Sequence, residues 1–178
     1  GREKDVYSIY EKMRRKKVAL GDKLFHDKRL SKDNSTSCAS CHNLARGGVD
    51  GLVTSIGIGG AKGPINAPTV FNSSLNFRQF WDGRAPTLEA QAKGPVLNPI
   101  EMAMPSEAAV EAVLDSIPGY VEAFAAAFPG EADPLNYTNM ARAIGAFERN
   151  LMTPGRLDAF MGGDLAALSE QERRGLET

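Results

Sequence analysis

The sequence is poor in the residue types that cross-link small proteins or bind most metals. Among 178 residues it has two cysteines, two histidines and one tryptophan. Because Cys38 and Cys41 lie in one short stretch, no thiol remains for a disulfide between distant segments. A zinc site is disfavoured for a similar reason, since beside these cysteines and His42 only His26 is left as a nitrogen ligand.

Long apolar runs and an excess of one charge are also missing. The longest apolar stretches, such as 120–128, are far shorter than the roughly 20 residues that span a bilayer, and no signal-peptide pattern opens the chain. Lysine and arginine together number 21 against 22 aspartates and glutamates, for a net charge of −1. Because the apolar stretches are short, we expect no membrane span. Because the balanced charges create no broad cationic field, we expect no nucleic-acid partner.

What the sequence does contain is the stretch SCASCHNLARGG at residues 37–48. Its Cys38, Cys41 and His42 follow the pattern C-x-x-C-H, by which a haem is attached covalently. The two thiols become thioethers, and the adjacent histidine becomes the proximal ligand of the iron. We therefore predict one covalently bound haem c in this chain. Such haems are attached outside the bacterial cytoplasm, which favours a periplasmic location.

Three side chains are candidates for the opposite face of the iron. His26 would point away from the apolar stripe of its helix, which indicates a surface residue rather than a ligand. Met102 and Met104 offer thioethers, and a methionine ligand would indicate an electron-transfer cytochrome. Methionine is more often a core residue than a ligand, so these residues alone leave the face open.

Apolar spacing predicts a mainly α-helical c-type cytochrome domain without strands. Leu20 and Leu24 mark one apolar stripe, and Met140, Ile144 and Phe147 recur at the spacing of a buried helical face. Capping signals define further helices, namely a serine at an N-cap, a proline in a first turn and a capping box. The predicted helical segments lie within 2–17, 20–25, 87–93, 107–114, 118–128 and 140–151, and from 169 onward.

One segment shows no periodicity at all. Residues 47–68 hold many glycines and two prolines, with no sustained spacing of either a strand or a helix. Long loops of this kind are uncommon inside compact domains unless they bind or wrap a large ligand. We therefore expect this glycine-rich loop to wrap the haem.

Three separated blocks resemble one known family. They are LGDKLFHDKRLSKDNSTSCASCHNLARGGVDG, GPINAPTVFN and QFWDGRAPTLEAQAKGPVLNPIEM. In order and spacing they resemble the N-terminal haem domain of bacterial di-haem cytochrome c peroxidases, relatives of the methylamine dehydrogenase maturation enzyme. The resemblance implies a peroxidatic cytochrome c domain at 1–164. Residues 165–178, which include ALSEQERRGLET, then resemble the start of a second cytochrome c domain that is cut off before its own haem.

For the peroxidatic haem, the resemblance implies that Cys38 and Cys41 are the anchors and His42 the proximal ligand. Glu101 matches the distal-pocket glutamate, and Gln91 matches a polar residue beside it. Glu101 also has a physical case, because cleaving a peroxide O–O bond needs a base that takes a proton from one oxygen and returns it to the other. A carboxyl half-buried near a haem has a raised pKa, which suits both tasks.

Two further positions are implied to connect this domain to the second one. Trp81 matches the tryptophan that lies between the two haems of the family, where it is a candidate electron conduit. The alternative for this single tryptophan is a packed core aromatic. Asn66 matches a position that helps to hold a calcium ion between the domains, with other ligands from the second half.

One position departs from the family pattern. In many relatives the glycine-rich loop supplies a histidine that caps the iron in the fully oxidised enzyme, and here Ile58 stands at that position. Because isoleucine cannot ligate iron, we predict a haem whose distal face is open, or holds only water, without prior reduction. The competing expectation is that another residue, such as Met102, occupies this face.

The implied function is the reduction of hydrogen peroxide to water. Electrons would come from a small donor protein, a cytochrome c or a cupredoxin, by way of the second haem. Relatives are commonly dimers, so a homodimer is expected. Two other functions stay open, namely a mono-haem electron carrier and a haem enzyme that oxidises a protein side chain.

Overall fold

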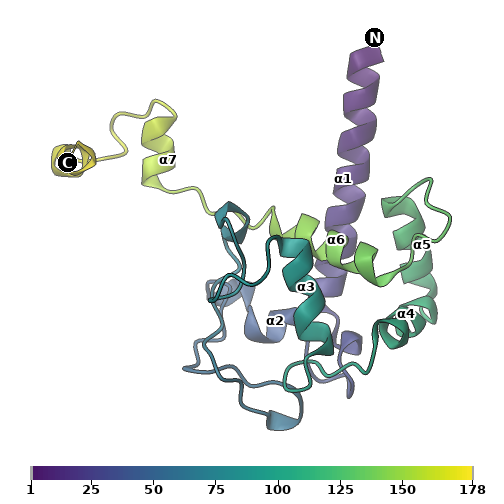
Figure 1. Cartoon of the computed structure of the whole chain (residues 1–178). Coiled ribbons are helices and arrows are strands. Elements are labelled where there is room, and N and C mark those ends of the chain that lie inside the picture. Colours follow the sequence, from purple (N-terminus) through teal and green to yellow (C-terminus); the bar gives the residue numbers. More distant parts are fainter. Residues whose placement is uncertain (1, 178) are drawn as a thin grey trace.

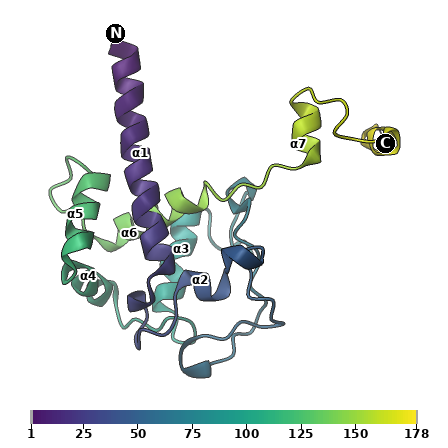
Figure 2. The ribbon, with the colours of Figure 1, turned by 180° about the vertical axis from the view of Figure 1, so that it is seen from behind.

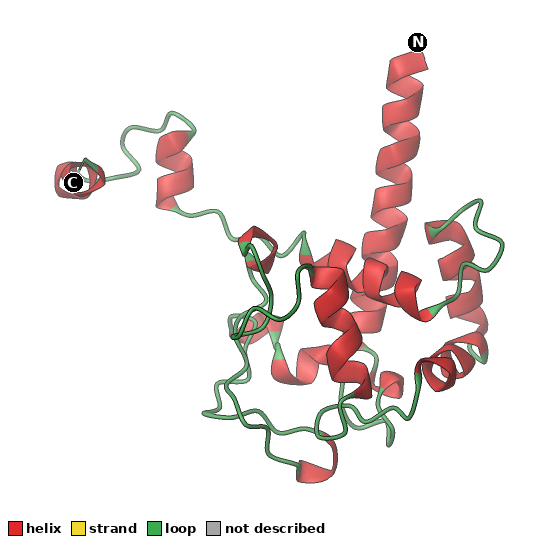
Figure 3. Ribbon diagram, in the orientation of Figure 1, coloured by secondary structure: helices red, strands yellow, loops and turns green. Residues whose placement is uncertain are grey.

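The computed structural model describes residues 2–177, and within that range it confirms the prediction of a mainly α-helical protein (Figures 1 and 3). The β pairing in those residues is limited to two isolated bridges. Short 3-10 turns lie in the loops: η1 (Lys28–Leu30), η2 (Leu44–Arg46), η3 (Ile58–Gly60) and η4 (Ser73–Leu75). The α-helices are α1 (Arg2–His26), α2 (Cys38–Cys41), α3 (Leu88–Leu97), α4 (Glu107–Asp115), α5 (Pro118–Ala127), α6 (Tyr137–Glu148), α7 (Arg156–Met161) and α8 (Glu170–Leu176).

The N-terminal segment forms one long helix rather than the two helical runs expected within 2–17 and at 20–25. Most residues of α1 are good helix formers such as Glu, Lys, Arg and Met, so the helix continues for 25 residues. Its first half projects from the body of the molecule, and its second half buries Leu20 and Leu24 (Figures 1 and 2). No helix within residues 2–177 is long and apolar enough to cross a membrane.

The predicted helix starts are confirmed where local capping decides them. The hydroxyl of Ser106 accepts a hydrogen bond from the first turn of α4, and Pro118 occupies the first turn of α5. Ser169 and Glu172 form the predicted capping box of α8. The helix expected at 87–93 is longer than predicted, because α3 begins after its N-cap and runs on through Leu97.

The core forms where α6 packs against α1 and α3, while α5 covers another side of α1. The predicted face of α6 is buried, with Met140 and Ile144 at most 1% exposed. Phe147 on the same face packs against Phe25 of α1, with ring centroids 5.2 Å apart and ring planes tilted by 56°. Burial of this face supplies most of the stability of such helices, since short helices are marginal alone in water.

The crossing of α1 and α6 depends on a glycine. A Cβ atom at Gly21 would overlap the carbonyl oxygen of Ala143 and would lie 2.7 Å from the Cβ of Phe147. Gly21→Ala is therefore expected to lower the free energy of unfolding by about 1–3 kcal/mol through overpacking, although alanine is the better helix former by roughly 1 kcal/mol. Urea unfolding followed by circular dichroism measures the change.

The matched control is Gly119→Ala on α5, where a Cβ would meet no atom within 4 Å. This change is expected to leave stability unchanged or to raise it by about 0.4–1 kcal/mol. Equal effects of the two substitutions would contradict the close approach of α1 and α6.

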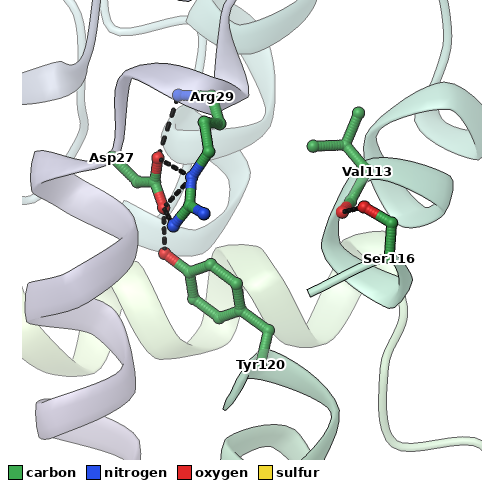
Figure 4. Close-up of polar contacts among 5 residues, drawn as sticks. All are labelled: Asp27, Arg29, Val113, Ser116 and Tyr120. Carbon is green, nitrogen blue, oxygen red and sulfur yellow. Dashed lines mark hydrogen bonds and ion pairs between the residues drawn. The ribbon is translucent and has the colours of Figure 1, made fainter. Parts of the chain in front are cut away.

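A side-chain hydrogen bond joins Tyr120 of α5 to Asp27, the residue that follows α1. The hydroxyl of Tyr120 donates a 2.6 Å hydrogen bond to Asp27, which also accepts from the guanidinium and the backbone N–H of Arg29 (Figure 4). These hydrogen bonds outweigh the desolvation of the carboxyl and lower the pKa of Asp27. The contact orients the chain where it leaves α1 and heads for the C-x-x-C-H stretch.

Two segments lie outside the helical core. Residues 47–68 form the predicted irregular loop, which contains the short turn η3 and the isolated bridge between Ile56 and Lys62. At the other end, α7 and α8 stand away from the body and connect to it through an extended segment (Figures 1 and 2). Core packing ends with the partly buried Leu151, just after α6.

Candidate functional site

An open cavity lies between α2, α3, the end of α6 and the glycine-rich loop. Its space outside protein atoms is about 1280 Å³, including the part open to solvent. Apolar side chains such as Phe25, Val70 and Ala92 form much of the wall. The seven residues to which the resemblance gives a haem, catalytic or calcium role all line this one cavity, namely Cys38, Cys41, His42, Asn66, Trp81, Gln91 and Glu101.

The two cysteines lie on α2, one turn long, at the wall of the cavity. The hydroxyl of Ser40 accepts a hydrogen bond from the N–H of Ser37, which caps this turn. Both thiols are free and partly buried. Burial and the nearby carboxyl of Glu148 raise the pKa of Cys38 to about 12. At neutral pH and without a bound metal this cysteine is therefore a thiol.

His42 directly follows α2 and has the environment of a ligand held in one orientation. Its Nδ1 lies 3.3 Å from the carbonyl oxygen of Gly48, so Nδ1–H donates and Nε2 is left for a metal. Burial lowers the pKa of His42, which keeps the imidazole neutral as a ligand must be. Gly48 adopts φ +74°, a conformation that favours glycine, and this turn directs its carbonyl at the ring.

The turn after α3 holds Glu101 at the cavity. Asn98 fixes this turn, because its backbone carbonyl accepts from the N–H of Glu101 and its side-chain oxygen accepts from Ile100. The side-chain amide of Asn98 also donates a 2.9 Å hydrogen bond to Oε1 of Glu101. Sequence reasoning missed this residue, although an asparagine directly after a helix and ahead of a proline is a typical turn signal.

The environment of Glu101 favours its neutral form. Burial raises the pKa of this carboxyl, against the opposing effects of the Arg84 guanidinium and the Asn98 amide. Gln91 reaches the same cavity from α3 and is half-buried. The structure thus brings a carboxyl with a raised pKa and a neutral amide to the cavity that also holds His42.

Trp81 and Asn66 are joined at the rim of the cavity. The indole N–H of Trp81 donates a 2.9 Å hydrogen bond to the backbone carbonyl of Asn66. Trp81 is 63% exposed, so it does not pack in the core of this chain. The side-chain amide of Asn66 donates to the carbonyl of Leu52 at 2.6 Å. Within residues 2–177, no group of three or more His, Cys, Asp or Glu side chains is arranged to hold a metal ion.

The other candidates for the second iron face lie in different places. His26 is exposed and paired with Asp22, in agreement with a surface residue. Met102 is 2% exposed and lines the cavity, whereas the buried Met104 does not line it. Ile58 is half-buried and lies outside the cavity wall, but its neighbour Gly57 is part of that wall.

A second carboxyl at the cavity was not singled out in the sequence. Glu148 is 5% exposed, lies at the end of α6 and lines the cavity. Burial raises its pKa to about 8, with a further contribution from the negative charge of Glu89 and an opposing one from Arg149. Its signal in the sequence is a charged residue four positions after Ile144, on the apolar face of α6.

Glu148 makes the stability of the protein depend on pH. Its carboxyl ionises near pH 4.5 when unfolded and near pH 8 when folded, so between these values the folded state holds the additional proton. Stability is therefore expected to be fully present below about pH 4.5 and to fall as the pH rises toward 8, by up to about 1.4 kcal/mol per pH unit from this group.

Unfolding by urea at a series of pH values, compared between the wild type and Glu148→Gln, measures this slope. The substitution is expected to remove the extra fall between pH 5 and 8, whereas Glu122→Gln at an exposed position of α5 should retain it. Identical slopes in the wild type and Glu148→Gln would show that the buried carboxyl does not contribute.

These residues fit a covalently bound haem. The thiols of Cys38 and Cys41 face one cavity together with the neutral imidazole of His42, as the attachment chemistry requires. The wall is also largely apolar, which suits a macrocycle. The donor set therefore matches haem c better than a metal ion held by side chains alone.

Comparisons with known proteins agree with this geometry. Residues 15–166 match the family model described as di-haem cytochrome c peroxidase. The cytochrome c551 peroxidase of Pseudomonas aeruginosa is 50% identical over 159 residues, which are 89% of this chain and 46% of that protein. The cytochrome c peroxidase Ccp of Escherichia coli is 51% identical over 166 residues, which are 90% of this chain and 34% of that protein.

The fold has a solved counterpart as well. A MauG-like protein associated with microbial copper homeostasis matches with a TM-score of 0.80 and 38% identity, covering 91% of this chain and 48% of that one. This chain thus spans between about a third and about half of the length of these three proteins. Since the family model covers most of the chain and implies haem c, the cofactor that the cavity fits, the chain belongs to the di-haem cytochrome c peroxidase family.

Proposed function

We propose that this chain forms the peroxidatic haem domain of a periplasmic enzyme that reduces hydrogen peroxide to water. One peroxide takes up two electrons and two protons and yields two waters. The observation that carries the proposal is the half-buried Glu101, whose pKa is raised, at the same cavity as the haem-attachment residues. The names of the relatives, cytochrome c peroxidases at about 50% identity, support the same activity.

In this proposal three residues hold the cofactor. Cys38 and Cys41 would form the thioethers, and Nε2 of His42 would be the iron ligand, while Nδ1–H donates to the carbonyl of Gly48. When bound, haem c supplies the redox-active iron at which the O–O bond of peroxide is reduced. The protein contributes the orientation of the imidazole and the largely apolar wall that limits access of water.

Glu101 moves the protons. Its carboxylate accepts a proton from one peroxide oxygen, and the resulting acid donates that proton to the other oxygen, which leaves as water. Burial raises the pKa of Glu101, so its protonated form is easier to reach than that of an exposed glutamate. The Asn98 amide keeps Oε1 in place, and Gln91 is a second polar group for orienting the peroxide.

The electrons reach this domain from outside the cavity. We assign their entry to the exposed Trp81, by way of a second haem domain that begins at 165–178 and receives electrons from a small cytochrome c or cupredoxin. Leu75 and Phe77, which precede Trp81 closely in the chain, are exposed apolar side chains too, and this exposure supports a covering domain. Asn66 would then contribute its amide oxygen, a ligand that calcium prefers, to an ion between the domains. The homodimer expected from the sequence belongs to this proposal too.

The distal face of the iron is proposed to be open in the fully oxidised protein, because Ile58 replaces the capping histidine. Ile58→His is expected to convert a high-spin ferric resting state into a low-spin one that reacts with peroxide slowly until it is reduced. Residue 58 is suited to this test, since its N–H is hydrogen bonded to the carbonyl of Glu101, which lines the cavity.

Low-temperature electron paramagnetic resonance of the oxidised, peroxide-free protein measures the spin state. An unchanged spectrum together with unchanged peroxide reactivity in Ile58→His would show that the loop position has no such role. A purely low-spin spectrum of the wild type would instead indicate a side-chain ligand, and Met102 in the cavity wall is the candidate that an electron carrier would use. A low-spin signal in addition to the high-spin one would come from a second haem.

The activity itself is tested by peroxide-dependent oxidation of a reduced small cytochrome c or cupredoxin, followed by visible absorption. The proposal expects turnover with two donors oxidised per peroxide. A protein that exchanges electrons with the donor but does not consume peroxide would be an electron carrier. Slow peroxide use with modification of a tryptophan or tyrosine on a partner protein would indicate the side-chain-oxidising function.

A further inference from the structure

The tip of the glycine-rich loop is closed on itself. The N–H of Gly57 donates to the carbonyl of Ala61 at 2.7 Å, and the N–H of Gly63 donates to Ser55 at the same distance. An isolated bridge between Ile56 and Lys62 lies between these two bonds. The loop tip therefore behaves as one compact unit, although it contains little regular structure.

This unit rests against the turn that carries Glu101. The N–H of Ile58 donates a 2.9 Å hydrogen bond to the backbone carbonyl of Glu101. At Gly57 the two backbones lie in direct contact, because an added Cβ would overlap the carbonyl oxygen of Ile100 and would lie 2.9 Å from the Cα of Glu101. Both obstacles are backbone atoms, so neither can swing aside as a flexible side chain would.

We propose that Gly57 is a positioning residue for Glu101: its missing side chain lets the loop lie against Ile100, and the hydrogen bond from Ile58 then holds Glu101 at the cavity. Asn98 braces the same turn through the Glu101 side chain, so the carboxyl is fixed from two sides. The inference rests on the proposed function for its kinetic consequence. The contact between the loop and the turn is independent of that function.

The test compares Gly57→Ala with Gly59→Asn in the haem-loaded protein. Gly59 belongs to the same loop, has φ +61° and would place a Cβ in open space, and asparagine tolerates that conformation. Hydrogen–deuterium exchange resolved to single amides reports the contact, because the Ile58 N–H is protected only while it is bonded to Glu101. Haem content and thermal unfolding of each variant are measured alongside.

Gly57→Ala is expected to expose the Ile58 amide to exchange and to lower kcat by about 10- to 100-fold, since a small misplacement of a catalytic group costs this much. The KM for peroxide should change little. The acid limb of the pH profile should move to lower pH, because a displaced Glu101 is less desolvated. Gly59→Asn should match the wild type in exchange, kcat and pH profile.

The proposal is overturned if Gly57→Ala keeps the kcat and pH profile of Gly59→Asn. If Gly57→Ala does not fold or bind haem, Ile58→Pro gives the decision, because it removes the N–H donor without adding an atom between Gly57 and Ile100. Unchanged kinetics in Ile58→Pro would then overturn the positioning role. If the wild type does not turn over peroxide, the proposed function fails. Independently of that result, a rapidly exchanging Ile58 amide in the wild type would show that the contact between the loop and the Glu101 turn is absent.

Discussion

Glu101→Gln is expected to lower the rate of peroxide turnover by about 10²- to 10⁴-fold, the usual contribution of a general acid–base group. Glutamine has nearly the same shape and can still accept the hydrogen bond that Asn98 donates to Oε1. It cannot take up and release a proton at neutral pH, so the loss isolates the proton transfer from the packing. Stopped-flow mixing of the haem protein with peroxide measures the rate of the first chemical step.

The control is Glu107→Gln, which removes an exposed carboxyl near the start of α4 and should leave this rate unchanged. The pH profile gives an independent check. In the wild type the rate should fall with acidification as the carboxylate of Glu101 is protonated, at a pH above the usual range of glutamate because burial raises its pKa. A rate in Glu101→Gln within a few-fold of the wild type would sink the assignment of this carboxyl as the acid–base group.

Replacing both cysteines, Cys38→Ser with Cys41→Ser, is expected to abolish covalent haem attachment. Serine cannot form the thioether, and each thiol lines the cavity without any other covalent partner. Without the haem, the largely apolar wall of the open cavity would lose the group that covers it, at a cost of roughly 25 cal/mol for each Å² of apolar surface left exposed. The double variant should therefore also lose a large part of its stability.

Mass spectrometry of the intact chain and haem staining after denaturing electrophoresis measure the attachment. Each single variant, Cys38→Ser or Cys41→Ser, is the matched control and should retain a haem through one thioether, with lower occupancy. Cys38 and Cys41 are the two cysteines of the sequence. Full covalent haem in the double variant would therefore show that the haem is attached through a group other than a thiol.

Local interactions are what could be predicted from the sequence. The hydroxyl cap at Ser106, the proline at 118 and the capping box from Ser169 act between residues three or four positions apart, so each is legible in the chain itself. The haem motif is local in the same sense, because Cys38, Cys41 and His42 follow one another. The length of α1 was underestimated because residues 2–17 and 20–25 were interpreted as separate helical runs. No proline separates them, so the helix continues to His26.

The functional site likewise combines residues that local patterns identify with residues that only a family resemblance or the fold identifies. The resemblance to a family proposed Glu101, Gln91, Trp81 and Asn66, and the structure brings all four to the cavity of the haem motif. Their roles remain to be tested by the experiments above. Spacing alone gave no reason to join Glu101 to Cys38, since the two are separated by more than sixty residues that include an irregular loop.

By itself, the sequence determined a helical c-type haem protein, because helix caps, apolar periodicity and the C-x-x-C-H motif are short-range patterns. Only the tertiary structure decided that Trp81 is exposed, that Glu148 is a buried carboxyl at the cavity, and that Gly57 lies against Ile100. Exposure, desolvation and close backbone contact depend on which distant segments become neighbours. That information arises only when the whole chain has packed, since each of these effects is set by atoms from another part of the sequence.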